Sequence, residues 1–207
     1  MTAVRDVNKG VVVSRITRIV LLTAIALFAA APVASASPAK KLDNNLAALW
    51  TTVLETPSAQ NSFGSGGAAF ACWNVGRTVA PFDDAPVESC TVKTGTKLFV
   101  IGSSFECSTF EGNGTSEAEL RTCAREADVP VAPTISVDGR AVPVADVETP
   151  LLAIVLPADN LFGQRAGTAG LSVTHSWVTL LDPLTPGTHT IVIGGSITTT
   201  IVVKPGL

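Results

Sequence analysis

Two histidines are the side chains in this 207-residue chain best suited to acid–base chemistry or metal binding near neutral pH. His175 and His189 stand in no recognisable catalytic or metal-binding motif. In a strand, His189 shares its side with Ile191 and Ile193, which places the ring at the rim of the core. We therefore expect structural histidines, and the sequence assigns no catalytic residue, no metal ligand and no cofactor.

Carboxylates offer two further kinds of chemistry. Glu106 and Glu111 could supply the acid and base of glycoside hydrolysis, but their spacing along the chain gives no separation in space. Asp83, Asp84 and Glu88 could bind calcium, yet they lack the alternating oxygen ligands of a calcium-binding loop. A solvated acidic loop is the better interpretation of these three residues.

The four cysteines, Cys72, Cys90, Cys107 and Cys123, can form two disulfides in three ways. No pair is spaced as closely as C-x-x-C, which disfavours both a zinc site and redox catalysis. We expect sequential pairing, Cys72 with Cys90 and Cys107 with Cys123. Each bridge would close a loop of about 15 residues and contribute about 3 kcal/mol of stability in the chain-entropy description.

The first 36 residues predict an export signal. Four basic residues precede an apolar run at 19–31, and Ala34-Ser35-Ala36 has the small-x-small pattern of a cleavage site. A retained membrane anchor is the alternative, but the run is shorter than the ~20 residues that span a bilayer. We expect a mature chain from Ser37 that is secreted, to the cell envelope or beyond, and that has no membrane span after cleavage.

The mature chain is acidic. The whole sequence has 14 basic and 17 acidic residues, of which the predicted signal peptide holds four and one, so the remainder carries a net charge of about −6. An acidic surface without lysine or arginine clusters argues against nucleic acid and anionic membranes as partners. The chain has no tyrosine, which is unusual for a carbohydrate-binding face.

These side chains must be held by a fold, and the clearest single element is a helix at residues 41–56. Its leucines, Trp50 and Val53 recur at helical spacing on one face, Asp43 or Asn44 can cap its start, and Pro57 ends it. A partner-binding helix is one interpretation. We prefer a helix that covers an open end of a β-sandwich, because apolar stripes usually belong to a core.

Strands and one more helix follow. Residues 68–75, 90–92 and 149–156 read as strands, and residues 98–101 are apolar enough for a strand buried on both faces. Residues 134–142 predict a hairpin that turns at Asp138-Gly139. A capping box from Ser116 to Glu119 opens a short helix, which Cys123 would pin and Pro130 would end. Residues 158–170 read as an irregular loop.

The closing strands permit a prediction of register. With a three-residue loop at Gly194-Gly195-Ser196, Ile193 pairs with Ile197 and Ile191 pairs with Thr199, and the isoleucines share one face. A two-residue loop would instead place Ile193 opposite Ser196. Since burying an isoleucine is worth about 1.5–3 kcal/mol, we expect the three-residue loop.

We therefore predict a mainly β chain, an antiparallel β-sandwich of Ig-like or jelly-roll-like type, with one N-terminal helix and one short disulfide-pinned helix. The signal peptide occupies 1–36, the N-terminal helix and linker 37–61, and the sandwich 62–207. Motifs at 90–100 and at 177–191, W-V-x-L-L-x-P-L-x-P-G-T-H-T-I, resemble a family of exported bacterial proteins of unassigned function. The resemblance implies a signal peptide followed by a β-rich domain, and it carries no catalytic residue.

Two hypotheses from different classes follow for the function. The first is a secreted or cell-envelope binding module that uses loops at one end of the sandwich to contact an unknown partner. The second is a hydrolase that acts on envelope or extracellular polymers. A pocket that converges on Glu106 or His175 with a nearby nucleophile would favour the hydrolase, whereas a flat, loop-lined end would favour the binding module. The decisive observation is whether residues 105–114 and 158–170 line a common cleft.

Overall fold

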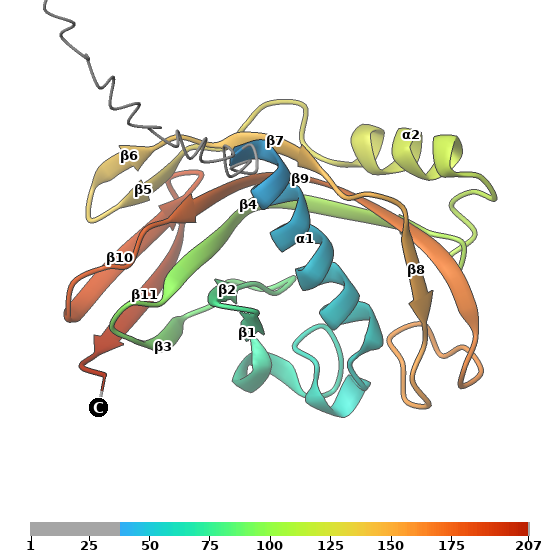
Figure 1. Ribbon diagram of the computed structural model, residues 1–207, viewed down its shortest axis with the longest axis horizontal. Coiled ribbons are helices and arrows are strands. Elements are labelled where there is room, and N and C mark those ends of the chain that lie inside the picture. The colour runs from blue at the N-terminus through green and yellow to red at the C-terminus, as the bar shows by residue number, and fades with distance from the viewer. Residues whose placement is uncertain (1–37, 207) are drawn as a thin grey trace, which may run out of the picture. The chain divides into compact units, whose positions relative to one another are not determined.

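The computed structural model of the chain describes residues 38–206, so the predicted signal peptide and its cleavage site lie outside the described residues. The described residues form two sheets and two α-helices (Figure 1). The helices are α1 (Pro38–Glu55) and α2 (Glu117–Ala127), with 3₁₀ turns at Ser58–Gln60 and Gly67–Phe70. The strands are β1 (Cys72–Val75), β2 (Thr78–Pro81), β3 (Ser89–Lys93), β4 (Lys97–Ser108), β5 (Ile135–Val137), β6 (Arg140–Val142), β7 (Ala145–Glu148), β8 (Leu152–Val155), β9 (Ala169–Leu181), β10 (Gly187–Ile193) and β11 (Ile197–Lys204).

The strands form two sheets that stay open at their edges. The first has the order β1-β2-β4-β9-β7, with β8 also paired to β9, and the second has the order β3-β11-β10-β5-β6. Most pairs are antiparallel, but β2 with β4 and β3 with β11 are parallel. The mainly β class with two helices is confirmed. The expectation of purely antiparallel sheets is wrong, because β3 and β2 each reach their partner by a crossover rather than a hairpin.

The strand predicted at 98–101 is confirmed as buried on both faces. Leu98 and Val100 pack in the core between the two sheets, where Ile191 and Ile201 meet them from the second sheet. The alternate residues, Phe99 and Ile101, point the other way, into a second core beneath α1. Successive side chains of a strand point to opposite faces, so this short apolar run serves both cores.

Helix α1 covers a face of the first sheet, where we predicted that it would cover an open end (Figure 1). Its apolar stripe packs on β1, β4, β7 and β8, and Leu46, Leu49 and Val53 are fully buried. The helix begins at Pro38, so the caps predicted at Asp43 and Asn44 are wrong. Proline suits the first helical turn, where its missing N–H costs nothing.

Three boundaries differ from the predictions. Residues 67–70 form a 3₁₀ turn that starts at a positive φ of Gly67, so the strand predicted at 68–75 begins only at Cys72. The strand predicted at 149–156 is the shorter β8, and β7 just before it was not predicted; the two separate at Thr149-Pro150, because proline cannot donate to a sheet. The last two residues of the predicted loop 158–170 already belong to β9.

Both predicted hairpins are confirmed. Asp138 and Gly139 form the β5–β6 turn with positive φ at each residue. In the β10–β11 hairpin Ile193 pairs with Ile197, and the loop is Gly194–Ser196. Ile201 is fully buried, whereas Ile197 at the end of the sheet keeps 41% of its surface exposed.

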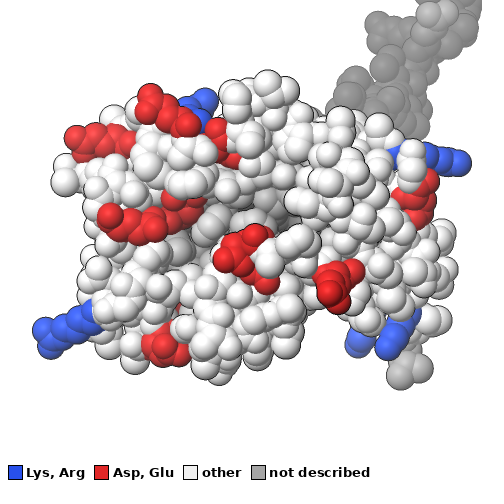
Figure 2. All heavy atoms as spheres, turned by 180° about the vertical axis from the view of Figure 1, so that it is seen from behind, with Lys and Arg blue, Asp and Glu red and all other residues white. Residues whose placement is uncertain are grey.

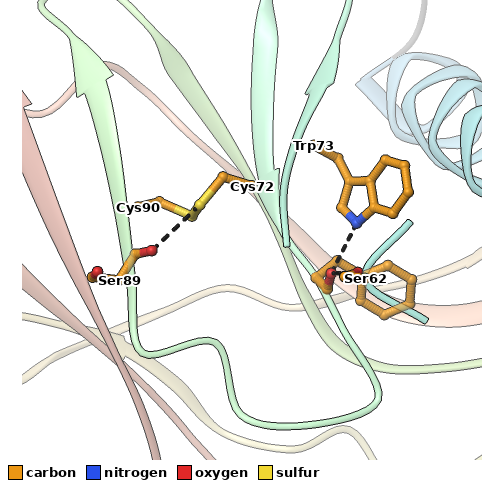
Figure 3. The surroundings of a disulfide bond; sticks show 6 residues. Ser62, Cys72, Trp73, Ser89 and Cys90 are labelled. Atoms are coloured by element: carbon orange, nitrogen blue, oxygen red, sulfur yellow. Dashed lines mark hydrogen bonds between the residues drawn. A yellow bond between two sulfur atoms is a disulfide. The ribbon is translucent and has the colours of Figure 1, made fainter. Parts of the chain in front are cut away.

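The disulfides join Cys72 to Cys90 and Cys107 to Cys123, which is the sequential pairing we expected. The first connects β1 of one sheet to β3 of the other, and the buried ring of the next residue, Trp73, points to the opposite side of β1 (Figure 3). The second attaches α2 to the far half of β4, where Leu120 and Ala124 pack on Val173. One bridge therefore joins the two sheets, and the other joins helix α2 to the first sheet.

Candidate functional site

The far halves of β4 and β9 carry polar side chains on the face beneath α1. Here the register places Ser104 opposite Ser176, Glu106 opposite Thr174, and Ser108 opposite Ser172. These six residues, which we call the polar strip, are buried except for half-buried Ser104. Alternation every second residue directs all six to the same side of the sheet.

Hydrogen bonds satisfy most of the polar strip. Trp50 Nε1 of α1 donates to Ser104 Oγ at 3.0 Å, and Ser104 Oγ lies 2.5 Å from Ser176 Oγ. Ser172 Oγ donates to Glu106 Oε1. The hydroxyl of Thr174 is buried and has no hydrogen-bond partner among the described residues. The strip thus contains an ionisable group and one unpaired hydroxyl under the helix.

A pocket of about 350 Å³ opens at one end of this strip. Helix α1 contributes Trp50, Val53 and Leu54, β4 contributes Ser104, Phe105 and Glu106, and three loops contribute Phe63, Glu111, Leu161 and Phe162. Segments 105–114 and 158–170 therefore line a common cleft. Their contact is direct, because the rings of Phe110 and Phe162 stack with centroids 5.6 Å apart and Gln164 Nε2 donates to the Phe110 carbonyl.

Glu106 lies in this pocket with only 8% of its surface exposed. Burial raises its pKa to about 8; the Ser172 hydrogen bond opposes the shift, and the negative charge of Glu111 adds to it. The carboxyl group is therefore protonated at pH 7. It can donate a hydrogen bond inside the pocket, or release a proton when a positive charge arrives.

Glu111 is exposed and stands at the rim. Its Oε2 accepts a weak hydrogen bond from Ser108 Oγ at 3.4 Å, while Asn113 Oδ1 accepts the backbone N–H of Ser108 at 3.0 Å. The loop from 109 to 116 leads directly into α2, whose capping box between Ser116 and Glu119 is formed as predicted. The carboxyls of Glu106 and Glu111, considered from the sequence as a pair, thus do meet in one pocket.

A smaller hollow of about 270 Å³ lies on the other side of an aromatic cluster. The cluster consists of Trp50, Phe63 and Phe82, with ring centroids 5.0–6.0 Å apart. Ser104 lines both cavities. The cluster therefore forms the partition between the two hollows.

The acidic loop lines the smaller hollow through Asp83 and Asp84, and Glu88 is exposed outside it. Burial raises the pKa of Asp83, and Asp84 adds to the shift. No group of three or more histidine, cysteine, aspartate or glutamate side chains in residues 38–206 is placed to hold a metal ion. Calcium binding by this loop therefore gains no support from the geometry.

His175 lies on the opposite face of the first sheet from Glu106, so the structure does not bring the two together. Its Nδ1 is 2.8 Å from Asp128 Oδ2 and its Nε2 is 3.0 Å from Asp146 Oδ1. Ser103 Oγ donates to Asp128 rather than to the ring. A nucleophilic serine activated by His175 would need a hydrogen bond to the imidazole, and the aspartates occupy both nitrogens.

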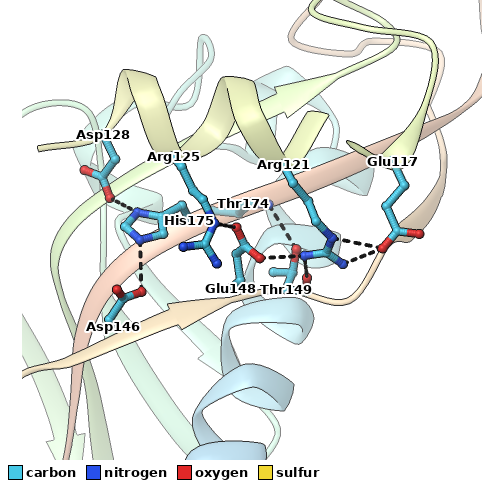
Figure 4. A network of polar contacts seen from close by, with 9 residues as sticks. All are labelled: Glu117, Arg121, Arg125, Asp128, Asp146, Glu148, Thr149, Thr174 and His175. Carbon is cyan, nitrogen blue, oxygen red and sulfur yellow. Dashed lines mark hydrogen bonds and ion pairs between the residues drawn. The ribbon is translucent and has the colours of Figure 1, made fainter. Parts of the chain in front are cut away.

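Next to His175, Arg121 and Arg125 of α2 form ion pairs with Glu148 of β7 at 2.8 and 2.6 Å, and Arg121 also pairs with Glu117 (Figure 4). Together with the His175 contacts, these pairs attach α2 to the edge of the first sheet. His175 thus links Asp128, at the end of α2, to Asp146 of β7.

His189 is also held at both nitrogens. Its Nδ1 is 2.7 Å from Asp138 Oδ2, and its Nε2 is 2.8 Å from the Thr185 carbonyl oxygen. Asp138 Oδ1 in turn accepts the Thr190 N–H, so the histidine links the two hairpins of the second sheet. Its pKa is raised, chiefly by the hydrogen bond to Asp138.

No protein-family model matches the chain, and no curated protein or solved structure is significantly similar to it. No helix within residues 38–206 is both long and apolar enough to cross a membrane. On the face shown in Figure 2, acidic side chains are spread over the surface and basic ones are few.

Sequence reasoning found Glu106 and Glu111 but missed the polar strip that surrounds them. The available signal was the alternation of polar residues in S-x-E-x-S at 104–108 and S-x-T-x-S at 172–176. Such a pattern normally marks a solvated strand face. Only the position of α1 shows that this face is buried.

Proposed function

We propose that the protein is a binding module whose ligand is a small molecule held in the pocket on Glu106. The common cleft formed by segments 105–114 and 158–170 carries this proposal. Its volume of about 350 Å³ lies at the lower end of the range for small-molecule sites, and its lining is mainly apolar and aromatic with few polar groups. A concave pocket replaces the flat loop surface that the sequence led us to expect for a binding module.

A hydrolase is the second candidate, because the pocket converges on a protonated carboxyl group with a second carboxyl at its rim. Glu106 would be the general acid and Glu111 the second carboxylate of a glycosidase. Binding alone remains the better proposal because it requires nothing beyond the pocket itself. A hydrolase with a serine nucleophile is disfavoured, because the hydroxyl beside Glu106, Ser172 Oγ, belongs to a fully buried residue and already donates to Glu106. A substrate has no access to that oxygen.

Titration with the neutral apolar dye Nile red tests the binding proposal. We expect saturable binding of one dye per chain, and loss of that binding in Leu161→Trp, which fills the pocket from its loop side. Val131→Trp is the matched control, because Val131 is 75% exposed and does not line the pocket. Binding that is absent in the wild type, or unchanged in the Leu161 variant, would overturn the proposal. Hydrolysis of chromogenic glycosides that disappears in Glu106→Gln would instead support the hydrolase.

We also propose that the protein is secreted, that it is related to the exported bacterial proteins it resembles, and that its two sheets form an Ig-like or jelly-roll-like sandwich. The two disulfides support an oxidising compartment, since such bonds rarely persist in the cytosol. N-terminal sequencing of the exported protein should begin at Ser37. A product that starts before residue 31 would count against the predicted cleavage site.

A further inference from the structure

The pocket on Glu106 combines aromatic rings with carboxyl groups. Trp50, Phe63 and Phe162 supply aromatic rings among its ten lining residues, and Glu106 and Glu111 are the titratable ones. No lysine, arginine or histidine lines it among the described residues. Aromatic faces carry a partial negative charge that attracts cations, so every charged or polarised element of this lining favours a positive ligand.

We propose that the ligand is an organic ammonium ion, whose charge lies between the aromatic rings and the carboxyl group of Glu106. This inference rests on the proposed binding function and specifies its ligand class. An ammonium group has an apolar periphery that fits the aromatic walls, and its charge is compensated by a carboxylate. An anionic ligand would meet two carboxyl groups and no cation, and a neutral one would leave the acidic groups without a role.

Binding requires a balanced proton transfer. In the free protein at pH 7 Glu106 carries a proton, because burial disfavours its charge. Arrival of the cation favours the carboxylate, so the O–H bond breaks and the proton passes to solvent. The complex then contains one ammonium ion and one carboxylate in place of a neutral carboxyl group.

We assign this proton exchange to Glu106 and Glu111, because the other charged groups nearby point away from the pocket, are bound elsewhere or do not line it. From β9, Ser172 and Thr174 face it, whereas His175 points to the opposite side of the sheet. Glu55 at the end of α1 accepts the N–H of Val155. In the 158–170 loop, Asp159 accepts the N–H of Ala59, and Arg165 is exposed and does not line the pocket.

A matched set of probes tests the charge of the ligand. Choline carries a permanent ammonium charge, its neutral isostere has carbon in place of nitrogen, and the corresponding carboxylate is an anion of similar size. Calorimetry at pH 9 should show choline binding about tenfold more tightly than the neutral isostere, a difference within the range of cation–π and charge contacts. The anion should show no binding. Equal affinities for choline and its isostere would overturn the proposal.

The proton supplies a second, independent measurement. Since the folded pKa of Glu106 is about 8, the affinity for choline should rise with pH up to that value and then level off, so that it is at least tenfold weaker at pH 6 than at pH 9. Calorimetry at pH 7 in buffers of different ionisation enthalpy should show a net release of protons, up to one per choline bound. Proton uptake, or an affinity that falls as the pH rises, would contradict the assignment.

Two variants complete the design. Glu106→Gln keeps the shape and the Ser172 contact but cannot ionise, so it should lose both the preference for choline and the proton release. Glu88→Gln removes a charge from an exposed site outside the pocket and should behave as wild type. If Nile red binds but choline does not, the ammonium proposal fails alone. If neither binds, the binding function fails with it.

Discussion

Strands β4 and β9 form one continuous ladder, of which one half is apolar and the other half is mostly polar. Residues 98–101 of β4, opposite 178–181 of β9, are apolar and lie in two cores. Residues 103–108, opposite 172–177, are mostly polar, and they form the polar strip on one face and the contacts of His175 on the other. Helix α1 covers both halves on one face, whereas on the other face the second sheet covers the apolar half and α2 covers the polar half.

The boundary between the halves is a bulge at Gly102. Ile101 pairs with Val178 and Ser103 with Trp177, so β4 contains one residue more than β9 at this point. A Cβ atom at Gly102 would lie 2.8 Å from Pro133 Cγ and 3.1 Å from the Trp177 carbonyl oxygen. Only glycine fits without a shift of its neighbours, and the extra residue changes which alternate side chains of β4 face α1, from Phe99 and Ile101 before it to Ser104 and Glu106 after it.

The largest expected loss of stability is in the apolar half. Phe99 is fully buried in the core beneath α1, so Phe99→Ala should lower the free energy of unfolding by about 3–5 kcal/mol. In the polar half, Ser176→Ala removes one hydroxyl and its contact with Ser104, and should cost about 1 kcal/mol. Urea unfolding of both variants checks the contrast. Similar costs for the two would show that the halves contribute alike to stability.

The Cys107–Cys123 bridge starts from the polar half, and the Cys72–Cys90 bridge lies in the core that holds Leu98 and Val100 of the apolar half; the two bridges span similar distances along the chain, 16 and 18 residues. The double replacements Cys72→Ala with Cys90→Ala, and Cys107→Ala with Cys123→Ala, should therefore each cost about 3 kcal/mol. Thermal and denaturant unfolding of the two variants provides the test. A bridge whose loss has no effect would mean that its half is held by packing alone.

We expect Glu106 to make the fold less stable as the pH rises, which is the opposite of the usual effect of a carboxyl group. Its pKa is raised on folding, so the folded state binds a proton more tightly than the unfolded state, and stability falls as the pH rises from about 4.5 to about 8. Glu106→Gln removes this dependence. The variant should equal wild type at pH 4 and exceed it at pH 9 by on the order of 5 kcal/mol, since the pKa rises from 4.5 to about 8 on folding and each pKa unit corresponds to about 1.36 kcal/mol.

Unfolding curves measured at both pH values check this expectation. Thr174→Val is a useful companion variant, because it removes the unpaired hydroxyl on the same strip without changing any charge. Its effect should be independent of pH. A Glu106 variant that is less stable than wild type at pH 9 would show that the ionised carboxylate is stabilised in the fold.

The apolar half could be predicted from the sequence, whereas the polar half could not. Four consecutive apolar residues at 98–101 identify a doubly buried strand, and local turn chemistry identified the hairpins at Asp138-Gly139 and Gly194–Ser196. These signals depend on neighbours along the chain. The disulfide pairing followed from short loops, which are also local.

The polar half depends on contacts between distant residues. Trp50 and Ser104 are 54 residues apart, and His175 lies 47 residues from Asp128 and 29 from Asp146. Serines that alternate along a strand have the same pattern whether water or a helix covers them. The expectation of purely antiparallel sheets failed for a similar reason. No local pattern reveals that β2 pairs in parallel with β4, or β3 with β11.

The aromatic cluster that separates the two hollows also has an optical consequence. The chain has three tryptophans and no tyrosine, so its near-ultraviolet emission comes from tryptophan alone. Trp73 is buried next to Cys72 in β1, and Trp177 lies on the far face of the first sheet near His175. Trp50 is the tryptophan that lines the pocket on Glu106. With the other two replaced by phenylalanine, the emission maximum of Trp50 would report directly on water leaving the pocket as a ligand enters.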